Sequence, residues 1–432
     1  MRSLSLLLLM LWLATAGLLA QSESASPEPE PTVQTLLARI QQLEKRMSEY
    51  EDHERKEATL NGNSALPFQG KPAQGCEMKD MEPQPQMAHA QPAPTSREVR
   101  EAQTHYPFLQ IHGFGDVNFS ATDQPGSVSG FNLGQFVLHF ASPLSEKVSY
   151  FGEVSFTAEP TGYDLTVERS IIRYDYNDYF KMSFGKYHTP VSYWNTAFHH
   201  GAWLQTTISR PEMVKVGGTF IPVHFVGLQA EGNVPSGPLG LGYNFGLGNG
   251  RSSNISKAGD AGDVSNNRAW VANLFARPSR LYGLQIGGSY YRDKLSIGPA
   301  ANFDEWIASG HLIWSKQHPE LLAEYANVHH RDLQTSQTFN TTAYYVQLAY
   351  RLPWQENKWK PYSRFEYIHR PNLEPVWDFT GVASTMDLVG TTVGVRYDIT
   401  TYAAFKGEYR NTRHGVGEPR VNGAFFQTAF TF

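Results

Sequence analysis

The run AFFQTAFTF at residues 424–432 alternates strictly between two sets of side chains. One parity holds Phe426, Thr428, Phe430 and Phe432, and the other holds Phe425, Gln427, Ala429 and Thr431. A period of two indicates a β-strand with one apolar face. In an open sheet this strand would leave an apolar edge, whereas a closed barrel has none. The run therefore predicts a closed β-barrel whose last strand ends at an aromatic residue.

The first twenty residues predict export from the cytoplasm. Met1, Arg2 and Ser3 form a short basic segment, and the apolar LSLLLLMLWLATAGLLA follows before the polar QSESASPEPEP. This order is that of a signal peptide at residues 1–20, with cleavage after Ala20 or, as the second choice, after Ala16. A retained transmembrane helix is the alternative, and the shortness of the apolar stretch disfavours it.

The composition fits a barrel with a polar interior. The chain is 41% hydrophobic and 13% aromatic, with 37 Gly and 22 Tyr, and no later apolar run approaches the roughly 20 residues that a helical span needs. A net charge of −5 implies no nucleic-acid partner. A single cysteine excludes an internal disulfide.

Between the signal and the barrel, two segments of different character are expected. Hydrophobic residues at Val33, Leu36, Ile40, Leu43, Met47 and Tyr50 are spaced three and four apart. This heptad predicts a short coiled coil within residues 30–60, and an ordinary amphipathic helix is the alternative. Residues 61–105 are rich in Pro, Gln and Ala and read as a flexible linker. Cys76 and nearby methionines in it are candidate Cu(I) ligands, although linker methionines are usually inert.

From residue 106 to residue 432 the alternating segments number sixteen, an even count that suits a membrane barrel. The expected strands are 108–120, 131–141, 147–157, 164–175, 180–189, 219–231, 239–249, 268–277, 282–292, 305–316, 320–329, 341–351, 360–369, 385–398, 403–412 and 422–432. Short connectors alternate with longer ones, except near 158–163. This pattern predicts short periplasmic turns at one end and long extracellular loops at the other.

Alternation within the strands predicts a polar lumen. In the expected strand 403–412, Phe405 and Tyr409 oppose Lys406, Glu408 and Arg410. A charge facing lipid near the bilayer midplane costs about 2–4 kcal/mol, so the charged parity is expected to line an aqueous channel.

The longest connector, residues 190–218, follows the fifth expected strand and contains Trp194, Phe198 and Trp203. These aromatic side chains need burial, so the connector is expected to fold into the barrel and pack on its wall. Arg210 and the His199–His200 pair are then expected to lie closest to a passing solute.

With a signal, heptads, a linker, sixteen strands and Phe432, the chain resembles the trimeric outer-membrane porin superfamily, and is most similar to phosphate-selective-type porins with an N-terminal coiled coil. The resemblance implies a homotrimer in outer-membrane lipid, assembled by the barrel-assembly machinery with Phe432 as a signal. It also implies an inward third loop that narrows the pore, diffusion of small hydrophilic solutes, and no cofactor. The cationic pore residues that it implies are Arg210 and Lys215 on the loop and Arg169, Arg173, Arg351, Arg364, Arg396, Lys406 and Arg410 on the wall, interleaved with acidic residues such as Glu408.

Two alternatives remain beside a general pore. Histidines at strand ends, with His188, His199 and His224 as candidate ligands, would coordinate Zn(II), Ni(II) or Cu(II) in a metal-uptake channel. An outer-membrane barrel enzyme is the other alternative, although the chain has neither a GxSxG nor an HExxH motif.

Overall fold

The computed structural model describes residues 106–198, 200–215, 220–251, 253–257, 259–298, 301–371, 373–379, 387–415 and 417–432. The predicted signal peptide (1–20), coiled coil (30–60) and linker (61–105) lie outside these residues, as does His199. Within the described residues, none of the helices has the length and apolar character to cross a membrane.

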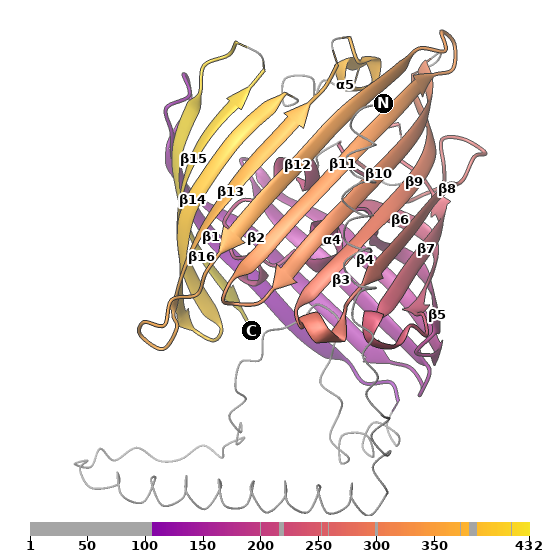
Figure 1. Ribbon diagram of the computed structural model, residues 1–432, viewed down its shortest axis with the longest axis horizontal. Helices are drawn as coiled ribbons and strands as arrows, with labels where there is room; N and C mark the ends of the chain where they lie inside the picture. The colour runs from indigo at the N-terminus through magenta and orange to yellow at the C-terminus, as the bar shows by residue number, and fades with distance from the viewer. Residues whose placement is uncertain are drawn as a thin grey trace, which may run out of the picture. The chain divides into compact units, whose positions relative to one another are not determined.

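Sixteen antiparallel strands in the described residues form a closed barrel, in which each strand pairs with its neighbours in sequence and β1 pairs with β16 (Figure 1). The strands are β1 (Gln110–Thr122), β2 (Gly130–Pro143), β3 (Val148–Glu159), β4 (Gly162–Asn177), β5 (Phe180–His188), β6 (His224–Asn233), β7 (Leu241–Asn249), β8 (Ala269–Ala276), β9 (Leu284–Gly298), β10 (Ala301–Ser315), β11 (Glu320–Asp332), β12 (Thr338–Ala349), β13 (Trp359–His369), β14 (Leu388–Thr400), β15 (Ala403–His414) and β16 (Val421–Thr431). The predicted fold and strand number are confirmed.

Side chains alternate across the wall as the sequence predicts. In β12, Val346 and Leu348 are exposed on the outer face, whereas Tyr345 and Gln347 are buried inside. In β15, Phe405 and Tyr409 face outward and Lys406 is buried. An apolar outer face suits contact with lipid, because the hydrocarbon core offers no partner for a charge.

Several strands are longer than the sequence suggested, and β9 to β12 are among them. Long connectors were expected near 293–304 and 330–340, but β9 extends to Gly298, β10 begins at Ala301, and β11 and β12 leave only residues 333–337 between them. The charged and glycine-containing stretches concealed the alternation there. The inner positions of these extensions, including Leu295, Ile297 and Phe303, are buried in the apolar core.

Short helices occur in the connectors. They are α4 (Tyr193–Ala197), η1 (Ala202–Leu204), η2 (Glu212–Val214), η3 (Gly237–Leu239), η4 (Ser279–Leu281) and α5 (Pro375–Phe379). The first three belong to the connector 189–223 between β5 and β6, and α5 belongs to the connector between β13 and β14. Figure 1 shows α5 at the end of the barrel opposite the C-terminal residue. An apolar core that includes Trp194, Met213 and Trp377 packs between these connectors and the inner face of the wall.

The barrel closes where β16 meets β1. Phe432 and Gly113 exchange both backbone hydrogen bonds, at 2.8 and 3.0 Å. The ring of Phe432 stacks on Phe136 at a centroid distance of 5.9 Å. A Cβ atom on Gly113 would lie 2.2 Å from this ring. A side chain at position 113 would therefore displace the Phe432 ring, and only glycine leaves room for this ring against β1.

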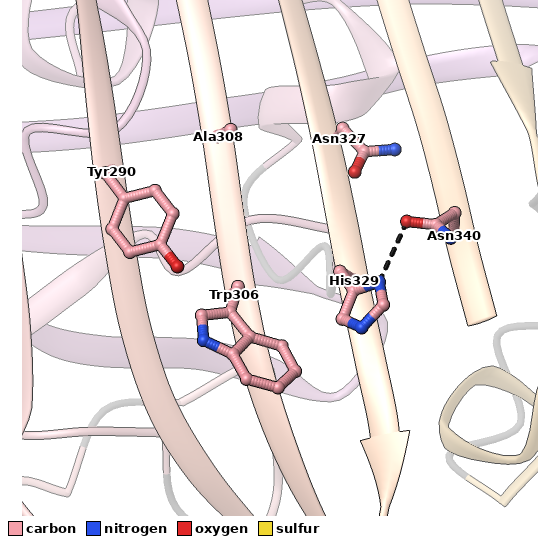
Figure 2. Close-up of a pocket in the computed structure, with 6 residues that line it drawn as sticks. All are labelled: Tyr290, Trp306, Ala308, Asn327, His329 and Asn340. Atoms are coloured by element: carbon pink, nitrogen blue, oxygen red, sulfur yellow. Dashed lines mark hydrogen bonds between the residues drawn. The ribbon is translucent and has the colours of Figure 1, made fainter. Parts of the chain in front are cut away.

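One shallow depression on the outer face is lined by polar and aromatic side chains. Figure 2 shows Tyr290, Trp306, Asn327, His329 and Asn340, which come from neighbouring strands between β9 and β12. His329 Nδ1 lies 2.9 Å from Asn340 Oδ1. Aromatic residues of this kind are common on the outer face of membrane barrels, where they form girdles at the two interfaces.

Candidate pore constriction

At the start of the connector 189–223, a glutamate from the opposite wall caps the short helix α4. Glu324 of β11 accepts hydrogen bonds from Ser192 Oγ at 2.5 Å, from the Tyr193 amide at 2.6 Å and from the Trp194 amide at 2.9 Å. These donors belong to the first turn of α4 or to the residue that precedes it. The first amides of a helix have no partner within the helix, so an acceptor is needed there. Glu324 supplies it from a strand far away in sequence.

Helix α4 is also held by the packing of Trp194 and by hydrogen bonds that join the two ends of the connector. The Trp194 side chain is 1% exposed, and its ring lies 6.0 Å from that of Tyr345 on β12 and 5.0 Å from that of Phe198. Asn195 Nδ2 donates to the carbonyls of Thr189 and Val223 at 2.8 and 3.1 Å. These bonds close the two ends of the connector against each other, so α4 projects from a fixed base.

Three wall cations on β13, β14 and β15, which we name the basic anchor, donate to backbone carbonyls of the connector. Arg364 donates to Ser209 O at 2.7 Å. Arg396 donates to Trp203 O at 2.7 Å and to Gln205 O at 2.9 Å. Lys406 donates to Ala202 O at 2.6 Å and to Thr207 O at 3.1 Å. All three were predicted to line the lumen, and the structure places them under the connector, at most 8% exposed.

Two wall carboxylates complete this contact by accepting from the connector. Glu408 accepts from the Ile208 amide at 2.9 Å and from Ser209 Oγ at 2.7 Å. Glu366 accepts from the Glu212 amide at 2.6 Å. Donors and acceptors alternate along the connector, so the buried backbone of residues 202–212 finds partners on the wall and the charges of the basic anchor are balanced locally.

The predicted residues of the connector differ in exposure. Trp203 is half-buried, with the Arg396 guanidinium 5.8 Å from its ring. Arg210 donates to the carbonyls of Val214 and Phe198, both at 3.3 Å, and burial lowers its pKa to about 10, so the side chain remains charged at neutral pH. Lys215 is exposed and forms an ion pair of 3.1 Å with Glu212.

The remaining predicted wall cations are paired with neighbouring carboxylates. Arg169 bonds to Glu153 and lies over the Phe151 ring. Arg173 pairs with Asp175 at 2.8 Å, and Arg410 pairs with Glu408 at 2.5 Å. Arg351 lies in the turn after β12 and pairs with Asp398. The interleaving of acidic and basic side chains seen in the sequence is thus a set of ion pairs.

On the other side of the connector, histidines gather around a glutamate. Glu168 of β4 has its Oε2 atom 2.8 Å from Nε2 of His224 and 3.3 Å from Nε2 of His200. The His188 ring centroid lies 5.6 Å from that of His224. We name Glu168, His200 and His224 the histidine cluster. Of the predicted metal ligands, His224 belongs to it, His188 lies beside it, and His199 is outside the described residues.

Glu168 was not among the predicted residues, and a β-bulge explains its position. In the register of β3 and β4, Glu153 pairs with Arg169 and Val154 pairs with Val167, so Glu168 is the extra residue. A bulge turns two consecutive side chains to one face. The adjacent charges of Glu168 and Arg169 were the available signal, because strict alternation would have placed one of them in lipid.

His330, another buried histidine, contacts the other large connector. His330 of β11 has its Nε2 atom 2.9 Å from Glu305 and its Nδ1 atom 3.1 Å from Glu374. The ring of Trp377 in α5 lies 5.0 Å from His330 and 6.3 Å from Phe220. The end of the connector 189–223 and the helix α5 therefore share one packed layer at the same end of the barrel.

Comparison with known proteins identifies the fold of the chain but no close relative. No protein-family model matches the chain, and no curated protein matches it. Among solved structures, an anion-selective porin from Comamonas acidovorans aligns with 76% of this chain and 100% of its own, at a TM-score of 0.55 and 11% identity. The chain has the fold of the outer-membrane porins.

Two further structures agree with that assignment. The outer-membrane channel DcaP of Acinetobacter baumannii aligns with 76% of this chain and 97% of its own, at a TM-score of 0.54 and 13% identity. The in-vitro folded outer-membrane protein OmpT of Vibrio cholerae, in its trimer form, aligns with 76% of this chain and 99% of its own, at a TM-score of 0.50 and 14% identity. All three structures are 14% identical to this chain or less, so what they share with it is the fold.

Proposed function

We propose that the protein is a diffusion porin that passes small hydrophilic solutes or ions through a lumen narrowed by the connector 189–223. The observation that carries the proposal is the attachment of this connector to the opposite wall. Its residues 192–194 bond to β11, and its residues 202–212 bond to β13, β14 and β15. A segment fixed to both sides of a barrel crosses the lumen and reduces its open section.

The size of the barrel supports a channel that the connector limits. A sixteen-stranded barrel is wide enough to hold an aqueous passage when nothing fills it. The wall cations of the basic anchor are occupied by the connector, so the residues that meet a solute at the narrowest point are expected on the connector itself. Arg210, Lys215 and His199 are the proposed candidates. His200 was also expected to meet the solute, but its side chain is 0% exposed and faces Glu168 of the wall.

Planar-bilayer recordings test this proposal. The wild-type protein should conduct, and a variant lacking residues 195–208 should show a conductance several times larger, because the lumen would be unobstructed. A variant with Leu333–Ser336 replaced by Gly-Asn-Gly-Ser is the matched control, since it changes a tight turn at the same end of the barrel. Equal conductance in the wild type and the deletion variant would mean that the connector does not limit the pore.

The charge of Arg210 provides a second readout on the same protein. Arg210→Glu should shift permeability toward cations, since a charge in a narrow passage of low dielectric acts strongly on ions. Lys358→Glu, in an exposed turn after β12, is the control and should leave the permeability ratio unchanged. A shift of equal size in both variants would assign the effect to the mouth of the barrel rather than to the constriction.

We also propose that three copies assemble in outer-membrane lipid. The porin fold and the heptad at 33–50 support a trimer, and cross-linking in mild detergent that yields only monomers would contradict it.

The packing of Phe432 on Phe136 and Gly113 supports a role for this residue in closure by the barrel-assembly machinery. Deletion of Phe432 should lower the amount of folded protein in cells while refolding in detergent is nearly unchanged. Unchanged cellular levels would contradict this role.

A further inference from the structure

We propose that Glu168, His200 and His224 bind one divalent transition-metal ion of the Zn(II) class, which fixes the connector 189–223 to β4 and β6. The three residues come from three separate segments of the chain, and their ligand atoms all lie within 4.8 Å of one another. A carboxylate and two imidazoles are a common ligand set for zinc. This inference concerns a binding site and holds whether or not the barrel conducts.

The distances fit a metal with little movement of the side chains. Bond lengths of about 2.0–2.2 Å in a tetrahedral zinc site put neighbouring ligand atoms about 3.3–3.6 Å apart. Oε2 of Glu168 lies 3.3 Å from Nε2 of His200 and 2.8 Å from Nε2 of His224. A shift of about half an ångström at His224 would bring its Nε2 to this spacing from Oε2 of Glu168. The three ligand atoms all lie within 4.8 Å of one another.

Neighbouring side chains hold two of the ligands in the orientation that a metal needs. Nδ1 of His200 lies 3.2 Å from the side-chain oxygen of Gln135. This oxygen only accepts, so Nδ1 carries the proton and the lone pair of a neutral ring is on Nε2, toward Glu168. Ser155 Oγ donates to Oε1 of Glu168 at 2.7 Å, which directs Oε2 at the histidines. Such outer partners are a regular part of metal sites.

The site is enclosed, which favours a fixing role over a place in the solute path. The side chains of His200, Glu168 and His224 are 0%, 4% and 11% exposed. His188, with its ring centroid 6.2 Å from that of His200, is the nearest candidate for a fourth ligand. An ion here would join a residue of the connector to two wall strands.

The charges around the cluster restrict which ions it accepts. Two cations offset the carboxylates near the cluster, because Lys186 acts on His224 and Arg210 acts on both Glu168 and Glu153. Glu168 is the single carboxylate of the ligand set. Mg²⁺ and Ca²⁺ prefer several oxygen ligands, whereas Zn(II), Ni(II) and Cu(II) bind imidazole well. We therefore expect micromolar Zn(II) to bind in the presence of millimolar Mg²⁺.

Equilibrium dialysis of the purified full-length protein against Zn(II), with metal analysis, tests the proposal. The wild type should bind one ion per chain in excess Mg²⁺. Glu168→Gln and His200→Ala should each weaken this binding at least tenfold. His369→Ala is the matched control, because His369 also contacts a carboxylate, Asp387 at 3.0 Å, but the pair is exposed and has no third ligand in the described residues. Loss of binding in the control alone, or no loss in the two cluster variants, would overturn the proposal.

Two measurements on the wild type make the test independent of how the variants fold. X-ray absorption of the zinc-loaded protein should show nitrogen and oxygen ligands at about 2.0–2.2 Å and no sulfur. A sulfur ligand would assign the ion to Cys76 and overturn the proposal. Zn(II) should also raise the thermal unfolding midpoint of the wild type, and an unchanged midpoint at saturating Zn(II) would rule out a role in fixing the connector.

Discussion

The connector 189–223 is held on its two sides by side chains of different chemistry. On β13, β14 and β15, the basic anchor donates to backbone carbonyls from two guanidinium groups and one amino group. On β4 and β6, Glu168 and His224 of the histidine cluster lie beside a single side chain of the connector, that of His200. The first contact is with the backbone and is spread over residues 202–210, whereas the second is local and depends on the state of imidazoles. A buried backbone needs hydrogen-bond partners along its whole length. A contact made by one imidazole depends instead on the protonation or metal binding of that ring.

Removal of one member of the basic anchor should have the largest effect. Lys406→Met leaves the carbonyls of Ala202 and Thr207 without their donor in a buried site, which should cost about 3 kcal/mol of unfolding free energy. Conductance should rise or become unsteady as residues 202–207 detach. Denaturant unfolding in detergent and bilayer recordings measure the two effects.

The matched control is Lys358→Met, because Lys358 pairs with an exposed glutamate in a turn. An exposed ion pair contributes at most about 1 kcal/mol. If Lys358→Met and Lys406→Met destabilise the protein equally, the contacts of the basic anchor with the connector contribute nothing of their own.

The cap of α4 should show an intermediate effect. Glu324→Gln keeps the shape of the side chain but replaces one of two acceptor oxygens by a donor that faces other donors, which should cost about 2 kcal/mol. Asp116→Asn is the comparison, because the Asp116 carboxylate also accepts from a backbone amide, that of Gln135 at 3.1 Å, but outside the connector. A smaller loss in Glu324→Gln than in Asp116→Asn would show that capping of α4 is not what fixes the start of the connector.

The histidine cluster should matter least when no metal is present. His200→Ala in metal-free buffer removes one neutral hydrogen bond and one contact with Glu168, which should cost about 1 kcal/mol. The difference from the wild type should grow when Zn(II) is added, because only the wild type gains binding energy. A metal-free loss as large as that of Lys406→Met would erase the distinction between the two sides of the connector.

The sequence predicted the barrel well because a wall residue that faces lipid must be apolar whatever its distant neighbours are. Every second residue of a strand faces lipid, so Val346 and Leu348 had to be apolar wherever the strand lay in the barrel. The same alternation gave sixteen strands before any pairing was known. The expected borders failed at β9 to β12, where glycine and charged residues interrupt the pattern while the backbone ladder continues.

The candidate site was predictable only in part. The aromatic residues Trp194 and Trp203 marked the connector as a segment that needs burial, and its length after the fifth strand suggested its place. The sequence also suggested a histidine group that includes His224, but it omitted Glu168, because a one-residue bulge reverses the faces of β4.

The sequence by itself determined the composition of the wall, through the period of two and the cost of a charge in lipid. Only the tertiary structure decided what the inner charges contact. Arg396 and Trp203 are 193 residues apart, and Glu324 and Trp194 are 130 apart, yet each pair forms a hydrogen bond. The alternation predicts that such a side chain faces inward, but the closure of the barrel determines which segment it contacts there.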